Sequence, residues 1–401
     1  MCFREPDRGA AIIVAAIALP VMIAGLGLVV DNGQAYDLKR RLQQAADAAA
    51  IAGAQEIKRD QAANVEKEVL RNAARNGFAK PGAEIGIFSP PATGRRAGQR
   101  GFVEVKIRHE APFRFLRVLS DERFTVEARA VAGVVSRRNC AVALNRSAPS
   151  AVRLGVGASI ELHDCGLHVN SDAPYALRAL GASALTSAGA DVVGGYKGQG
   201  FVPPPLKGVE AIEDPLASVL APGIAGCLRS QRVRVERHDS FSPGVYCGGI
   251  EVAPEGTAVL APGVYVLKGG GLAVEGTLHG ESVMFYNTTG SYGYRPIVFA
   301  AGSIAKLSAP RTGAHAGILF FQDRAVSRGA TNELVGSARS RFEGALYFAT
   351  TALSFTGATG MDQQPVVIVA DTIELNGPLR LTAPAGSERI APPTRQAALV
   401  Y

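Results

Sequence analysis

Apolar residues fill the chain from Ala10 to Val30, and no charged side chain occurs in this run. At about 1.5 Å rise per residue, a helix of this length reaches roughly 30 Å, the thickness of the hydrocarbon core of a bilayer. Pro20, Gly25 and Gly27 interrupt the run, and membrane helices tolerate such residues better than soluble ones. The pattern predicts a transmembrane helix over 10–30, preceded by a cytoplasmic tail over 1–9.

A cleaved signal peptide is the alternative reading of this segment. Its apolar region normally spans about 7–15 residues and is followed by a small-residue cleavage site. The run here is longer, and no clean A-x-A site follows it directly. We therefore expect the anchor to be retained.

A second periodic segment follows, from Tyr36 to Ala54, with small and apolar residues spaced alternately by four and three. This spacing places them on one seam of a helix: Leu38, Leu42, Ala45, Ala49 and Ala52. The helix can continue through Glu56–Arg75 to a stop at Asn76-Gly77. The seam can pack on its own domain or on a partner subunit, and the sequence leaves both alternatives open.

The next stretch predicts a small sheet. Residues 80–100 are rich in Pro and Gly and indicate a loop, whereas Phe102–Ile107 and Phe124–Val135 have the alternation of strands. Residues 31–135 are thus expected to form a long helix plus a small antiparallel sheet, an α+β segment.

From Cys140 the pattern changes to short apolar runs separated by Gly, Ala and Ser, with imperfect repeats. GASIEL at 157–162 recurs as GASALT at 181–186, an offset of 24, and PGVYCGG at 243–249 recurs as PGVYVLKGG at 262–270. A β-sandwich would also give many short strands, but it would not give a fixed offset. We expect an all-β domain, a parallel β-helix, with first coils over 136–200, a Pro-rich bridging segment over 201–235 and further coils over 236–401. The offset predicts that Val169 and Val193 are stacked inward, with Glu161 facing outward.

Composition and charge narrow the function. The chain has 401 residues, 47% of them apolar, which suits two folded units outside a membrane. The net charge of +7 is dispersed, with no block of five or more consecutive like charges. We therefore expect no nucleic-acid partner.

Four cysteines lie on one side of the apolar run: Cys140, Cys165, Cys227 and Cys247. Their spacing reads most simply as two local disulfides in an oxidising compartment. The basic residues flanking the apolar run, Arg4 and Arg8 before it and Lys39 to Arg41 after it, mildly favour the opposite orientation by the positive-inside rule. The cysteine pairing, together with the family resemblance described below, outweighs a difference of one charge, so the bulk of the chain is expected outside the cytoplasm.

Candidate chemistry is sparse. His163, Asp164, Cys165 and His168 are the best metal candidates, but a strand would put His163 and Cys165 on one face and His168 on the other, so we expect no metal and no cofactor. No dense carboxylate pair such as D-x-D occurs in the repeats, so we expect no enzymatic activity. A glycan-binding aromatic ladder would have to come from five tyrosines: Tyr246, Tyr265, Tyr286, Tyr292 and Tyr294.

The segment RGAAIIVAAIALPVMIAGLGLVVDNGQAYDLKRRLQQAADAAAIAGA resembles the N-terminal segment of TadG-like proteins of the Flp/Tad pilus-assembly system. The features that carry the resemblance are Arg8-Gly9, Pro20, Asp31, Tyr36 and the Ala-rich block 42–54. Two departures matter. Val14 stands where cleaved prepilin-like relatives have Glu, which implies no processing, and the D-x-S-x-S metal motif of a von Willebrand A-like domain is absent from the sequence.

The resemblance implies a single-pass protein of the bacterial inner membrane with its C-terminal bulk in the periplasm or outside the cell. It implies a structural or assembly component of a pilus or related envelope system, whose partners are other pilus-assembly or pilin-like membrane proteins contacted through the Ala-rich helix. The alternative is a β-helix protein that binds envelope polysaccharide or peptidoglycan, and a glycan-cleaving enzyme is a third possibility.

Overall fold

The computed structural model describes residues 8–79, 82–111, 125–291, 293–391 and 393–400, together with few of the side chains before Gly25. The chain divides into two compact units, one formed by Met1–Val135 and Arg395–Tyr401 and the other by Ser136–Thr394. Each unit is described by itself below.

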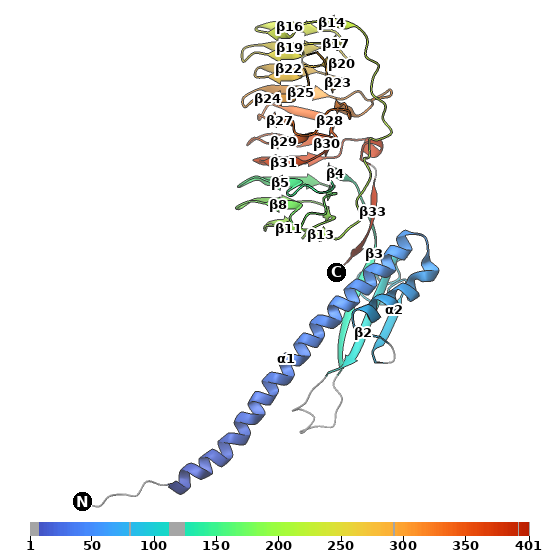
Figure 1. Ribbon diagram of the computed structural model, residues 1–401, viewed down its shortest axis with the longest axis vertical. Helices are drawn as coiled ribbons and strands as arrows, with labels where there is room; N and C mark the ends of the chain where they lie inside the picture. Colours follow the sequence, from blue (N-terminus) through green and yellow to red (C-terminus); the bar gives the residue numbers. More distant parts are fainter. Residues whose placement is uncertain (1–7, 80–81, 112–124, 292, 392, 401) are drawn as a thin grey trace, which may run out of the picture. The chain divides into compact units, whose positions relative to one another are not determined.

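The first unit combines a helical hairpin with a four-stranded sheet of order β1-β2-β3-β33 (Figure 1). Pairing of β2 with β1 and with β3 is antiparallel. Its elements are α1 (Arg8–Lys58), the 3-10 turn η1 (Ala62–Asn64), α2 (Val65–Arg75), β1 (Glu84–Phe88), β2 (Phe102–Glu110), β3 (Thr125–Arg137) and β33 (Thr394–Leu399).

Three differences from the predicted α+β pattern have local causes. The expected continuous helix breaks at Asp60, whose φ of 58° is left-handed, so α2 folds back beside α1. The expected loop over 80–100 contains β1, because Ile85 and Ile87 pair in register with β2. The last strand, β33, joins the first unit instead of forming a coil of the β domain.

The small residues of α1 are buried against this sheet. Leu42, Ala45 and Ala49 are fully buried, in one cluster with Val103 and Val105 of β2. The approach is close, since a Cβ added to Gly53 would meet Val69 at 2.9 Å and Val103 at 3.1 Å. Of the two alternatives for the Leu38–Ala52 seam, the structure shows packing on its own domain.

The predicted membrane segment, 10–30, lies within α1. In the part of the chain that the structure describes, no helix is both long and apolar enough to cross a bilayer. Most side chains of the predicted segment before Gly25 lie outside the described residues.

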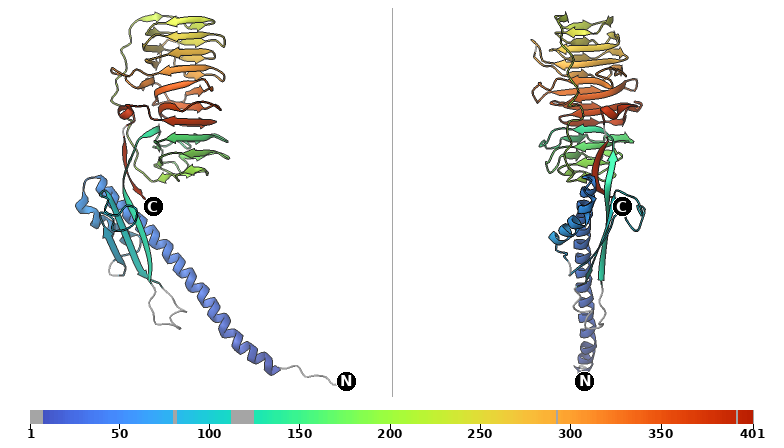
Figure 2. Two further views of the ribbon diagram at one scale, coloured as in Figure 1. Left: turned by 180° about the vertical axis from the view of Figure 1, so that it is seen from behind. Right: turned by 90° about the vertical axis from the view of Figure 1, so that its right-hand side faces the viewer.

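The second unit is a large domain of stacked, parallel-paired strands, as expected of a parallel β-helix (Figure 2). Three successive strands form one coil, and equivalent strands stack into three faces. The first face holds β4 (Asn139–Ala143), β7 (Gly166–Val169), β10 (Ala190–Val192), β13 (Leu206–Lys207), β14 (Cys227–Arg229), β17 (Gly244–Tyr246), β20 (Gly263–Lys268), β23 (Val283–Thr288), β26 (Ile318–Gln322), β28 (Arg341–Phe348) and β30 (Gln364–Ala370).

The second face is a ten-stranded sheet made of β5 (Val152–Leu154), β8 (Leu177–Ala179), β11 (Tyr196–Lys197), β15 (Val233–Val235), β18 (Ile250–Val252), β21 (Leu272–Val274), β24 (Ile297–Phe299), β27 (Thr331–Val335), β29 (Ala352–Thr356) and β31 (Ile373–Asn376). The third face holds β6 (Ser159–His163), β9 (Ala184–Thr186), β12 (Phe201–Val202), β16 (His238–Phe241), β19 (Thr257–Leu260), β22 (Thr277–Gly280), β25 (Ile304–Ser308), β32 (Pro378–Thr382) and the starts of β28 and β30. A short 3-10 turn, η2 (Ser387–Arg389), follows the last coil.

The order of the coils in space differs from their order in the sequence. The last coil stacks on the first, because β30 pairs with β4, β31 with β5 and β32 with β6. In Figure 1 the red strand β31 therefore lies beside the green strand β5. The β domain starts with β4 in the middle of the stack, and its coils then follow one another to one end. Residues 208–226, which we call the return segment, lead back to the other end, where the coils resume with β14.

The return segment packs on the outside of the first face. Its Leu216 is buried, in one cluster with Val245 and Tyr286. Asn170 fixes the start of the segment by donating to the carbonyl of Ile212 at 2.8 Å and accepting from its N–H at 2.9 Å. The predicted bridging segment of 201–235 is thus wider than the segment that leaves the coils, since its flanks form β12 to β15.

The coil register differs by one residue from the predicted offset of 24. Val169 pairs with Val192, one residue short of the offset, and the expected partner Val193 is half-buried. Val152 pairs with Leu177, one residue beyond the offset. The corners between faces differ in length, so no single offset describes a whole coil. Glu161 faces outward and is exposed, as the alternation predicted.

Candidate functional site

A groove opens on the third face, beside β25 and β28. It has a volume of about 790 Å³, and strands and turns of several coils line it: Gly280, Glu281, Ser282, Lys306, Leu307, Ser308, Arg311, Ala338, Arg339, Ser340, Arg341, Glu343 and Asp362. This volume lies within the range of pockets that hold small ligands.

The groove forms where the third face changes its pairing. β25 pairs with the start of β28, but the register of β28 with β30 begins only at Gly344 and Val366. Gln364, the first residue of β30, pairs with β32 instead, and its buried side chain accepts a hydrogen bond from the N–H of Phe342 at 2.7 Å. The side chain of Gln364 therefore takes the place of a backbone hydrogen bond between the two strands. The turns around Ser340 and Asp362 form the walls of the groove.

Like charges are stacked on the floor of this groove. Lys306 and Arg341 face each other in register on neighbouring parallel strands, about 4.8 Å apart along the stack, and His279 precedes Lys306 in the same row. Burial lowers the pKa of His279, and the charge of Lys306 lowers it further. Adjacent like charges on one face of a sheet are destabilising unless something compensates them.

Carboxylates compensate only part of this charge. Glu343 lies 3.5 Å from the guanidinium of Arg341 and 3.8 Å from that of Arg311. Among the described residues, no carboxylate lies within ion-pair distance of Lys306 or Arg339. The groove thus offers unpaired cations next to acceptor carboxylates and serine hydroxyls.

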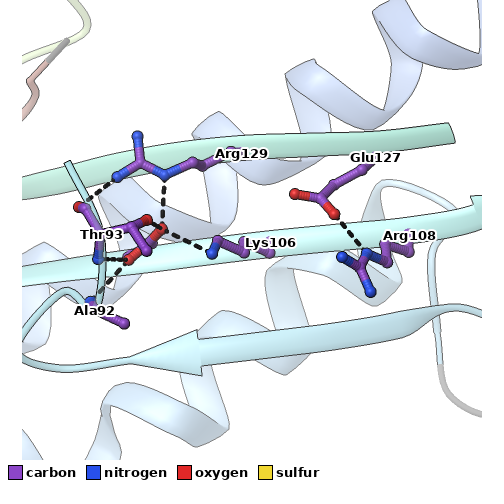
Figure 3. A network of polar contacts seen from close by, with 7 residues as sticks. Ala92, Thr93, Lys106, Arg108, Glu127 and Arg129 are labelled. Atoms are coloured by element: carbon purple, nitrogen blue, oxygen red, sulfur yellow. Dashed lines mark hydrogen bonds and ion pairs between the residues drawn. The ribbon is translucent and has the colours of Figure 1, made fainter.

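A second polar cluster lies in the first unit, on the face of β2 that points away from α1 (Figure 3). Buried Glu104 accepts hydrogen bonds from the hydroxyl of Thr93 at 2.6 Å, from the N–H groups of Ala92 and Thr93 at 2.8 and 3.0 Å, and from Nε of Arg129 at 2.6 Å. Lys106 adds an ion pair at 3.4 Å.

These contacts decide the protonation state of Glu104. Burial of its carboxylate raises the pKa, but the hydrogen bonds from Thr93, Arg129 and Ala92 outweigh burial and lower the pKa from 4.5 to about 2. The carboxylate is ionised and saturated with donors, so it fastens the loop before β2 to the sheet and is not poised for proton transfer.

The cysteines pair as the sequence predicted. Cys140 is bonded to Cys165 and Cys227 to Cys247, and each disulfide joins two neighbouring coils. Cys165, one of the residues considered as a metal ligand, is bonded to Cys140. His163 and Asp164 are exposed and lie 3.2 Å apart, whereas His168 is buried, so the structure does not bring His168 to the other two. Within the described ranges, no group of three or more His, Cys, Asp or Glu side chains could hold a metal ion.

Among the described residues, the tyrosines considered for a glycan-binding ladder are buried or half-buried. Tyr246 and Tyr265 stack inside the coils at 6.0 Å between ring centroids, and Phe285 continues the row at 5.6 Å. Tyr286 is buried beside the return segment, Tyr294 is half-buried, and Tyr292 lies outside the described residues. The described tyrosines therefore form no solvent-facing aromatic ladder.

The groove was missed by the sequence analysis. The row His279, Lys306 and Arg341 has unequal spacing, because a long excursion separates β25 from β28. The available signal was the alternation inside IAKLS and RFEG, which places Lys306 and Arg341 on the outward side of their strands.

Comparison with known proteins finds a family match for one part of the chain. Residues 9–56 match the Tad family model, which describes Flp pilus-assembly TadE/G-like proteins. No curated protein and no solved structure matches the chain. The matched residues lie entirely within α1.

Proposed function

We propose that the chain is a membrane-anchored, non-enzymatic structural or assembly component of a Flp/Tad-type pilus or a related envelope system, and that it presents its β domain outside the cytoplasm. The observation that carries the proposal is the TadE/G-like match over residues 9–56. Proteins of this family are associated with the cell envelope, and the partners implied are other pilus-assembly proteins.

The anchor in this proposal is the segment 10–30. In the described part of this segment, large apolar side chains project from α1 without cover: Leu19, Met22, Leu26, Leu28, Val29 and Val30 are between 45% and 70% exposed. Contiguous exposed apolar side chains of this kind favour a membrane or protein surface as their surroundings. A retained bacterial inner-membrane anchor accounts for them.

The two disulfides support the orientation. Disulfides persist in oxidising compartments such as the periplasm and are rare in the cytosol. Because both bonds lie in the β domain, they favour its placement in the periplasm or outside the cell.

The surface that we propose for contact with partner proteins differs from the Leu38–Ala52 seam that the sequence suggested. Leu38, Leu42 and Ala45 are already buried against the sheet of their own unit, so they are not free for a partner. We propose that pilin-like membrane proteins contact the uncovered part of α1 before Leu38, where Tyr36 is 76% exposed.

A fusion experiment tests this proposal. The full chain with alkaline phosphatase at its C-terminus is expected to be active in intact cells, and the protein is expected to resist salt and alkaline washing of membranes and to require detergent. Active cytoplasmic reporter fusions at the same point, or release by salt, would refute the anchored topology. Loss of piliation on deleting the gene tests the assembly role separately.

The groove favours a second candidate function, the binding of an envelope polysaccharide by the β domain. Its mixed charges and hydroxyls suit a polar ligand better than an apolar one. In this reading the β domain is a binding module carried by the anchor, and it has no cleaving activity.

A further inference from the structure

We propose that the groove on the third face binds an acidic polysaccharide, with Lys306, Arg339 and Arg341 contacting the carboxylates of its sugar units. This inference deepens the second candidate function by naming the chemical class of the ligand. It relies on the proposed function only for placing the groove outside the cytoplasm.

Repulsion between the cations stacked on the groove floor is only partly compensated within the protein. Lys306 and Arg341 are paired in register on neighbouring strands. Of the two, only Arg341 has a carboxylate partner among the described residues. Placing like charges in register costs stability, and an anionic ligand lying across both strands removes that cost. Arg339, which also has no carboxylate partner in the described part, adds a third cation from the adjoining turn.

The carboxylates of the groove favour an acidic sugar over other polyanions. The lining also contains the carboxylates of Glu281, Glu343 and Asp362. These groups repel a polyanion whose backbone carries no hydrogen-bond donors, as in DNA. A uronic acid unit carries both a carboxylate, which pairs with Lys or Arg, and hydroxyl groups, which donate to carboxylates.

The row that contains Lys306 and Arg341 runs along the axis of the coil stack. Lys306 and Arg341 occupy successive coils of this row, so the two cations lie at the spacing of parallel strands, about 4.8 Å apart. A second, smaller hollow of about 190 Å³ shares Asp362 with the groove and adds Glu161 and Arg380. The polar surface therefore continues across several coils, as an extended polymer needs.

The test measures binding of a labelled oligogalacturonate to the full chain in detergent. The double variant Lys306→Gln/Arg341→Gln removes the stacked pair. The matched control is Arg153→Gln/Arg178→Gln, an in-register basic pair on neighbouring strands of the second face. All four side chains point outward, and equal thermal melting of the variants establishes that each is folded.

We expect saturable binding by the parent, with Kd raised about tenfold or more by the groove variant and changed less than about twofold by the control. A neutral oligosaccharide of equal length is expected to bind far more weakly. The variant Glu281→Gln/Asp362→Asn is expected to weaken oligogalacturonate binding while strengthening that of single-stranded DNA.

Four results would overturn the inference: no saturable binding, equal loss in the groove and control variants, equally tight binding of the neutral oligosaccharide, or tighter binding of single-stranded DNA by the parent. None of these bears on membrane topology or piliation, so the failure of this inference and the failure of the proposed function are distinguishable.

Discussion

Ile368, in the last coil of the β domain, is paired in parallel register with Ala141, in the first. Both residues are fully buried in one apolar core that runs through the stack. The two runs of coils, from Asn139 and from Cys227, therefore share a core and meet at this junction. The apolar side chains at this junction are buried only when both runs of coils are folded.

A charge at the junction tests this dependence. We expect Ile368→Asp to bury an unpaired carboxylate and to cost several kcal/mol of unfolding free energy, on the order of 3–5. Because the core is shared, hydrogen exchange should accelerate both in the coils before the return segment and in those after it. Acceleration confined to 341–382 would show that the two runs are independent.

The matched control crosses the same junction on the surface. Glu374 of β31 lies 3.8 Å from Arg153 of β5, and both side chains are partly exposed. Exposed ion pairs contribute about 0–1 kcal/mol, so Glu374→Gln is expected to change the melting temperature little.

A second prediction concerns the end of the stack. The Cys227–Cys247 disulfide ties the first coil after the return segment to the next one, closing a loop of 20 residues. Loops of this size correspond to about 3 kcal/mol in the chain-entropy account. We expect Cys227→Ser/Cys247→Ser to expose the backbone of β14 to β16 to exchange while the distant coils stay protected.

The other disulfide supplies the comparison. Cys140 and Cys165 are buried in the middle of the stack, where coils lie on both sides. Their replacement by serine is expected to lower the stability of the whole β domain without local fraying. If both double variants fray in the same segment, the assigned coil order is wrong.

The sequence predicted the type of fold better than the order in which the coils stack in space. Alternation within short strands is a local property, so outward Glu161 and inward Val169 were correctly assigned. The pairing of Ala141 with Ile368 depends on a return path that no repeat encodes. The repeat offset also misplaced Val193, because corner lengths vary while the pairing register is set by inward side chains such as Val192.

The candidate site was less predictable for the same reason. Lys306 and Arg341 are ordinary outward residues in the sequence, and only stacking makes them neighbours. The aromatic residues illustrate the opposite error. Tyr265 looked available for a ligand, but its hydroxyl donates to the carbonyl of Ala261 at 2.7 Å, so a buried ring satisfies its polar end internally.

A third prediction concerns what holds the return segment. The guanidinium of Arg324 donates to the carbonyls of Leu216 and Val219 and to the hydroxyl of Tyr347, which itself donates to Asp214. Burial, together with the neighbouring Asp214 carboxylate, raises the pKa of Tyr347, so its hydroxyl stays protonated as a donor. We expect Arg324→Ala to raise hydrogen exchange in 210–221 by about tenfold or more, since buried carbonyls lose their donors.

Arg328 provides the matched control for this variant. It lies in the same turn region but pairs with Asp371 at 3.2 Å and is largely exposed. Arg328→Ala should leave exchange in the return segment unchanged. Equal acceleration by the two variants would mean that Arg324 does not anchor the segment.

The last prediction is the acid response of the first unit. The pKa of Glu104 is about 2 in the folded protein against an ordinary value of 4.5, a difference that corresponds to about 3 kcal/mol. Because the folded pKa is the lower one, this stabilisation is fully present above about pH 4.5 and is lost as pH falls toward 2. Glu104→Gln is expected to be less stable near pH 7 and to lose less stability on acidification. Glu127→Gln, which removes the exposed partner of Arg108, is the control and should retain the parent's acid response, since its side chain is 37% exposed. Melting of the full chain, followed through exchange of amides in β2 between pH 2 and 7, measures these slopes. Parallel pH dependences for Glu104→Gln and the parent would show that Glu104 does not control the acid stability of this unit.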